Sequence, residues 1–171
     1  SYERLEEADL ELNRRRVLNA MDLEVARLDE ITQGWAASGI LNLMVNFPAM
    51  SLYRDMFVNA ISGSFDIREL AVIGADNRLI VARESEPGNE NLDLPLDENS
   101  PFVSAVLHTD LARHPDEGST QKGLAYMDGT IHLVSSHPNL DFERRLGNSS
   151  LVAAVHYNEA AVVRLERIVE Q

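Results

Sequence analysis

The sequence contains no cysteine, a single lysine (Lys122) and no long apolar run. Without cysteine the chain has no disulfide, no thiolate metal site and no cysteine nucleophile. No stretch approaches the roughly 20 apolar residues that cross a bilayer, and no signal peptide is present. Basic groups are also scarce, with 15 Lys and Arg against 28 Asp and Glu, a formal net charge of −13. This negative field excludes general binding to nucleic acid or to anionic membrane surfaces.

The remaining composition is that of one globular domain. The 171 residues are 44% hydrophobic and 25% charged, which is ordinary for a chain that buries a single core. The chain opens with Ser1, not with methionine, and closes inside the helical pattern of residues 162–171. We therefore expect it to be part of a larger protein.

One long helix is predicted over residues 1–39. Its apolar residues recur at intervals of seven, four and three, at Leu10, Val17, Met21, Leu28, Ile31 and Trp35. Gly39 is expected to end the helix. The apolar stripe either packs wholly on its own domain, or its first turns, residues 5–17, extend beyond the domain and pair with a second copy. We favour partial pairing, which predicts a homodimer through this helix.

The rest of the chain is predicted as short helices and strands. Residues 40–47 are a second helical region, Pro48 interrupts it, and Ser51 is expected to cap a helix to about Ile61. Ser100-Pro101 is a helix start. Asp128-Gly129 is the best hairpin signal in the chain. The expected strands are residues 70–73, 79–82, 122–127, 130–136 and 151–157, the expected loops 84–99, 113–120 and 139–148, and the final helix 158–171.

This order favours an α+β fold with an antiparallel sheet, because hairpins dominate and no strand–helix–strand unit repeats. The first two strands are apolar on both faces, so they are expected at the centre of a sheet that is covered on both sides. We expect a PAS-like five-stranded antiparallel sheet with a long N-terminal helix and a C-terminal helix. The chain is then one sensor domain: a signalling helix (1–39), a PAS-like core (40–157) and an exit helix (158–171).

Several segments resemble the fourth class of CHASE domains, which are extracellular sensor domains. They are Gly34-Trp35-Ala36, the hairpin of residues 70–81, Gly123-Leu124, and residues 129–138 and 150–157. The resemblance covers roughly residues 12–170. It departs at residues 37–40, where members carry acidic and aromatic side chains, so the roles of those side chains are not carried over. The resemblance implies a periplasmic sensor between two membrane helices, coupled to a cyclic-di-GMP enzyme, a histidine kinase or a chemoreceptor output.

The five histidines are the first candidates for a site. None of their spacings matches a set of metal ligands, so no metal site is predicted, and no cofactor is expected. His132 and His156 are the best candidates to line a ligand pocket, because both lie within predicted strands. The alternative for each is a surface position or a hydrogen-bonded structural role.

Four other residues are candidates for the same pocket. Trp35 is first a core anchor, with a ligand-facing ring as the alternative. Tyr53, Tyr126 and Arg83 are expected to add polar tips to a cavity between the sheet and the helices. Arg83 suits a carboxylate ligand, and a surface arginine at a strand end is its alternative.

The sequence carries no nucleophile elbow and no glycine-rich phosphate loop, so no enzyme activity is predicted. The leading hypothesis is a sensor domain in which an unidentified small solute changes the arrangement of the terminal helices, near residues 17–35 and 162–169. The second is a dimerisation or partner-docking module of the periplasm without a small ligand. The third is a cytosolic PAS-like accessory domain.

Overall fold

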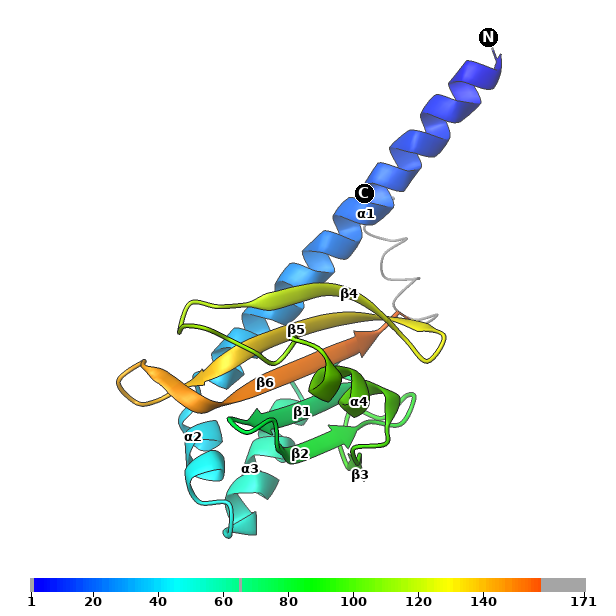
Figure 1. Cartoon of the computed structure of the whole chain (residues 1–171). Coiled ribbons are helices and arrows are strands. Elements are labelled where there is room, and N and C mark those ends of the chain that lie inside the picture. Colours follow the sequence, from blue (N-terminus) through cyan, green and yellow to red (C-terminus); the bar gives the residue numbers. More distant parts are fainter. Residues whose placement is uncertain (1, 65, 158–171) are drawn as a thin grey trace.

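Six strands form one antiparallel sheet in the order β3-β2-β1-β6-β5-β4 (Figure 1). The computed structural model describes residues 2–64 and 66–157. Its elements are α1 (Tyr2–Ala36), α2 (Gly39–Asn46), α3 (Ser51–Ser62), β1 (Glu69–Gly74), β2 (Leu79–Glu84), β3 (Leu94–Pro95), α4 (Pro101–His108), β4 (Gln121–Met127), β5 (Thr130–Leu140) and β6 (Leu146–His156). The predicted α+β class with an antiparallel sheet and a long N-terminal helix is confirmed. The predicted final helix, 158–171, lies outside the described residues.

The sheet has six strands where five were predicted. The added strand, β3, has only two residues, lies at the edge and contains Pro95, which is tolerated there because an edge strand leaves backbone groups unpaired. The expected loop 139–148 was also wrong in part. β5 continues through Pro138 to Leu140, with a register shift just after the proline, and β6 begins at Leu146. A proline inside a strand is accommodated at such irregularities.

The local signals for turns and caps are largely confirmed. Asp128 and Gly129 both have positive φ, 50° and 74°, as a two-residue hairpin of the favoured type requires. Ser100 caps α4, and its Oγ accepts a hydrogen bond from the amide of Val103 at 3.2 Å. Ser51 does not cap α3, because Met50 occupies that position. Gly39 does not end the first helix, as was expected: α1 ends at Ala36, and Gly39 is the first residue of α2, which Ser38 caps.

Apolar side chains alternate along the strands and form a core on each face of the sheet. On one face Leu70, Val72 and Leu151 pack against α1, α2 and α3, whose contributions include Leu28 and Phe57. The other face carries Ala71, Ile73, Val134 and Val152, and packs against Phe102, Val103 and Val106 of α4. β1 is buried along nearly its whole length. The predicted central position of this strand, covered on both sides, is confirmed.

α1 has two halves with different surroundings. Its buried residues begin at Ala20, and from there the helix lies across β4, β5 and β6. The turns before Ala20 project beyond the sheet (Figure 1), and Leu10 there is 69% exposed. With 35 residues the helix is about 52 Å long. Of the predicted stripe, Met21 and Leu28 are buried, whereas the first turns do not pack on the domain.

Within residues 2–64 and 66–157, no helix combines the length and the apolar content that crossing a bilayer requires.

Candidate functional site

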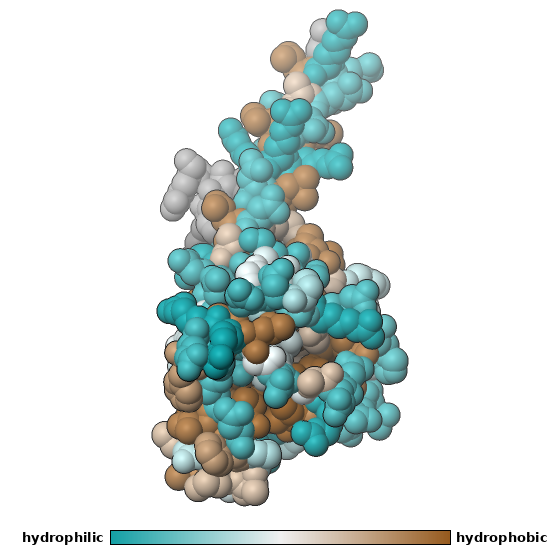
Figure 2. All heavy atoms as spheres, turned by 60° about the vertical axis from the view of Figure 1, so that its left-hand side comes forward, coloured by the Kyte–Doolittle hydropathy of each residue, from teal (hydrophilic) through white to brown (hydrophobic). Residues whose placement is uncertain are grey.

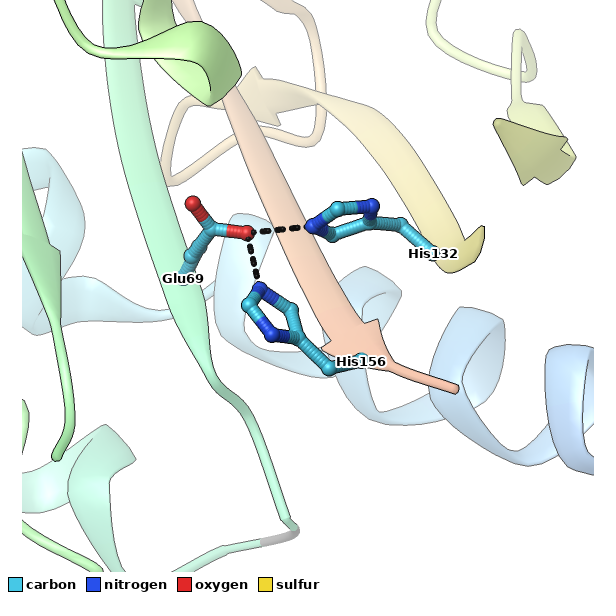
Figure 3. A group of neighbouring side chains, drawn as sticks. All are labelled: Glu69, His132 and His156. Carbon is cyan, nitrogen blue, oxygen red and sulfur yellow. Dashed lines mark hydrogen bonds and ion pairs between the residues drawn. The ribbon is translucent and has the colours of Figure 1, made fainter. Parts of the chain in front are cut away.

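Glu69, His132 and His156 converge on the α4 face of the sheet from three neighbouring strands (Figure 3). Side chains alternate along a strand, so Glu69 lies on the same face as the α4-facing Ala71. His132 and His156 are direct cross-strand partners in β5 and β6. Glu69 is opposite Ala154, two residues before His156, so register alone brings the three side chains together.

One carboxylate oxygen joins the two rings. Oε1 of Glu69 lies 2.7 Å from Nε2 of His156 and 3.0 Å from Nε2 of His132. The rings are nearly perpendicular, at 79°, with centroids 4.2 Å apart. Nδ1 of His132 lies 3.0 Å from the carbonyl oxygen of Thr130. Each ring nitrogen of His132 therefore has a polar contact, and the ring orientation is fixed from both sides.

The cluster is buried, so the charge of its side chains affects the stability of the fold. The side chains of Glu69 and His132 are only 8% and 5% exposed, and that of His156 is 25% exposed. Burial raises the pKa of the Glu69 carboxyl, but the hydrogen bonds and charges of the two histidines lower it by more, so its pKa lies below the ordinary value. Glu69 is consequently ionised at neutral pH. A buried carboxylate is costly unless it is paired, so this arrangement needs its partners.

A cavity of about 210 Å³ opens above the cluster, between the sheet and the start of α4. Its polar wall includes Glu84 and Asp128 besides the three clustered side chains, and Phe102 and Met127 are part of its apolar wall. Its volume is sufficient for a small solute or an ion. It combines a few convergent polar groups with apolar walls, as small-ligand sites commonly do.

The fold is shared with sensor domains, although no family model and no curated protein matches the sequence. The periplasmic domain of LuxQ from Vibrio cholerae superposes with a TM-score of 0.64 at 11% identity, over 94% of this chain and 70% of that one. The sensor domain of DcuS from E. coli superposes with a TM-score of 0.51 at 11% identity, over 89% of this chain and 98% of that one. A domain of a sensory box/GGDEF family protein from Vibrio parahaemolyticus gives 0.57 at 10% identity, over 92% and 62%. At these identities the likeness establishes the fold alone.

A second polar cluster lies on the opposite face of the sheet and holds α1. Oδ1 of Asp29 accepts hydrogen bonds from Thr120 Oγ1 at 2.8 Å, Ser135 Oγ at 2.9 Å and His137 Nε2 at 2.7 Å. Lys122 Nζ is 3.6 Å from Oδ2. Burial raises the pKa of Asp29, but these hydrogen bonds and the charge of His137 outweigh it and leave the pKa below its ordinary value.

The other predicted site residues are not in the cavity of the histidines. Trp35 is half-buried and packs edge-on against Phe57, with centroids 6.2 Å apart, in keeping with a core anchor. Tyr53 packs against the ring of Phe47. Arg83 lines a separate hollow of about 360 Å³. Tyr126 is 75% exposed on the edge strand β4.

The sequence pointed to His132 and His156 but not to Glu69. A signal was present, because Glu69 directly precedes the predicted strand 70–73 and shares the face of Ala71. The contact of Glu69 with His156 spans 87 residues of sequence, and the pairing of β1 with β6 that creates it is not encoded in a local pattern.

Proposed function

We propose that this chain is the periplasmic ligand-sensing domain of a bacterial transmembrane signalling receptor, and that the cavity above Glu69, His132 and His156 is its ligand site. The observation that supports this most is the buried polar cluster itself. Side chains at these positions would pack more stably if they were apolar, and polar groups retained in a core commonly mark a functional site. The fold, shared with periplasmic sensor domains, fits this role.

β5 offers a physical link between the cavity and the long helix. His132 faces the cavity, while Ser135 and His137 on the same strand face α1 and donate hydrogen bonds to Asp29. A ligand that contacts His132 and shifts β5 therefore changes the anchoring of α1. The ligand biases the position of α1 only by its differential affinity for the two arrangements.

The receptor context completes the proposal. Residues 1–39 serve as the signalling segment, 40–157 as the PAS-like core and 158–171 as the exit segment, as in the fourth class of CHASE domains that the sequence resembles. The parent protein is embedded in the inner membrane and carries a cyclic-di-GMP enzyme, a histidine kinase or a chemoreceptor as its output. The domain itself is not an enzyme. Its first turns pair with those of a second copy.

Thermal-shift screening tests the ligand site directly. Amino acids, polyamines and other small cations, and small carboxylates are screened against the wild-type chain and against His156→Gln. We expect a stabilising compound to raise the Tm of the wild type, to lose most of this effect in His156→Gln, and to keep it in His108→Gln, a control at the exposed end of α4 that does not line the cavity. Loss of the effect in the control alone, or no stabilising compound at all, would count against sensing in this cavity.

One observation favours a second function, docking of a partner protein. Phe47, Met50, Leu52 and Met56, where α2 meets α3, are between 47% and 59% exposed. Figure 2 shows apolar surface gathered at this lower end of the molecule, away from the start of α1. Clustered apolar surface commonly marks an interaction site. A double variant, Leu52→Ser with Met56→Ser, is expected to remove partner binding and to keep small-ligand binding intact.

A further inference from the structure

The cavity that holds Glu69, His132 and His156 has an excess of negative groups. Glu69 and Glu84 are direct cross-strand partners in β1 and β2, and Asp128 lines the same cavity. Like charges opposite each other on adjacent strands repel and destabilise the pair. Of the described residues that line this cavity, none is lysine or arginine. Three acidic residues therefore line the cavity without a permanently charged cation among the lining residues to balance them.

The contact between His132 and Thr130 determines which ring nitrogen is available as a ligand. The carbonyl oxygen of Thr130 can only accept a hydrogen bond, so Nδ1 of His132, 3.0 Å away, carries the hydrogen. In the neutral ring the lone pair is then on Nε2, which lies 3.0 Å from Oε1 of Glu69. Two lone pairs at this distance repel unless a proton or a metal cation lies between them. A backbone carbonyl that orients a histidine in this way is typical of metal sites.

We propose that Glu69, His132 and His156 bind a divalent transition-metal ion, with its remaining coordination positions open to the cavity. The ligand atoms of the three residues all lie within 4.8 Å of one another. Metal–ligand bonds of about 2.1 Å place neighbouring ligand atoms roughly 3.0 to 3.4 Å apart. The two contacts that Oε1 of Glu69 makes, 2.7 and 3.0 Å, need to widen by only a few tenths of an ångström to match this spacing.

The donor set also selects the class of ion. Two imidazole nitrogens with one carboxylate oxygen suit Zn²⁺, Fe²⁺ and their neighbours, whereas Ca²⁺ and Mg²⁺ prefer oxygen ligands throughout. The start of α4, residues 100–102, also lines the cavity. Its partial positive charge of about half a unit opposes a cation, but the three acidic residues that line the cavity outweigh it. This inference rests on the proposed function, because it names the ligand class of the same cavity.

Calorimetric titration of Zn²⁺ into the chelator-treated 171-residue chain tests the site. We expect one ion per chain, with affinity at least about 10-fold weaker in His156→Gln and in Glu69→Gln. His108→Gln is the matched control, because His108 is exposed on α4 and away from the cavity. Circular dichroism checks that each variant is folded, and His156→Gln is the safer variant since its side chain is partly exposed. Co²⁺ gives a second readout, because its visible absorption reports nitrogen and oxygen coordination.

The outcomes separate this inference from the function it rests on. Equal Zn²⁺ affinity in the wild type, His156→Gln and Glu69→Gln overturns the metal site. No Zn²⁺ binding, combined with stabilisation by another small solute that His156→Gln abolishes, overturns the metal site and supports sensing. Zn²⁺ binding that depends on both residues, without any change in amide exchange along α1, supports the metal site and overturns sensing.

Discussion

Nε2 of His137 donates a 2.7 Å hydrogen bond to Oδ1 of Asp29, and this contact joins β5 to α1. The same carboxylate oxygen accepts hydrogen bonds from Thr120 and Ser135, while Asp29 is only 14% exposed. The apolar residues of α1 would by themselves let the helix slide or rotate on the sheet, because hydrophobic contact is not directional. Asp29 therefore fixes the position of the helix along the sheet.

Replacing Asp29 by asparagine tests this anchor. The variant keeps the size of the side chain but loses the charge that strengthens three hydrogen bonds. We expect the free energy of unfolding to fall by about 1.5 to 3 kcal/mol, the usual range for hydrogen bonds to a charged group. Urea unfolding measures the change. Asp22→Asn, an exposed position on the same helix, is the control and should change stability by less than about 0.5 kcal/mol. Equal effects of the two substitutions would remove the anchoring role.

The surroundings of His114 indicate that the folded chain becomes less stable in weak acid. Its Nδ1 lies 2.9 Å from Ser119 Oγ and its Nε2 lies 2.8 Å from Ser136 Oγ. Burial, and to a lesser extent the charge of His137, lowers the pKa of His114 from 6.5 to about 4. Between these values the unfolded chain binds more protons than the folded chain, so stability is complete above pH 6.5 and falls as the pH drops toward 4.

Urea unfolding at a series of pH values from about 7.5 to about 5 checks this, in the range where unfolded carboxyl groups are mostly ionised. His114→Gln should show a smaller loss of stability over this range than the wild type, because glutamine does not titrate. His108→Gln keeps His114 and should follow the wild-type curve. If His114→Gln has the same pH dependence as the wild type, His114 is not the group responsible.

Features that depend on neighbouring residues, such as turns and helix caps, could be predicted from the sequence. Features that depend on pairing between distant strands could not. The Asp128-Gly129 turn and the Ser100 cap are set by neighbouring residues, and both were predicted correctly. Pro138 suggested the end of a strand, but pairing with Ser150 carries β5 past it. The same distinction holds for the residues of the candidate site. His132 and His156 were identified from their strands, whereas Glu69 joins them only through the register between β1 and β6.

Gly147 is required by the close approach of β6 to β5. A Cβ atom at this position would lie 2.8 Å from both the backbone oxygen and Oδ1 of Asn139. Asn139 is 1% exposed, and its Nδ2 donates a 2.9 Å hydrogen bond to the carbonyl of Ala36 at the end of α1. We expect Gly147→Ala to displace Asn139 and to destabilise the chain by about 1 to 3 kcal/mol in thermal or urea unfolding.

Gly34 is the matched control for this substitution. It lies in α1, and a Cβ atom there meets no atom within 4 Å. Alanine is the better helix former, so Gly34→Ala should stabilise the chain by up to about 1 kcal/mol. The same chemical change therefore has opposite signs at the two positions. A neutral Gly147→Ala would show that β5 and β6 move apart freely at this point.

The exposed leucines in the projecting half of α1 indicate that the chain self-associates. Leu5, Leu10 and Leu12 are 68%, 69% and 48% exposed in turns that do not contact the sheet. Pairing with a second copy would bury this surface, and each leucine contributes up to about 2 kcal/mol when fully buried. We expect sedimentation velocity to show a concentration-dependent dimer that Leu10→Glu shifts to monomer without lowering Tm. Leu52→Glu, at a leucine of α3 that is 59% exposed, should leave the dimer unchanged. A dimer that persists in Leu10→Glu and is lost in Leu52→Glu would place the interface at the α2–α3 end instead.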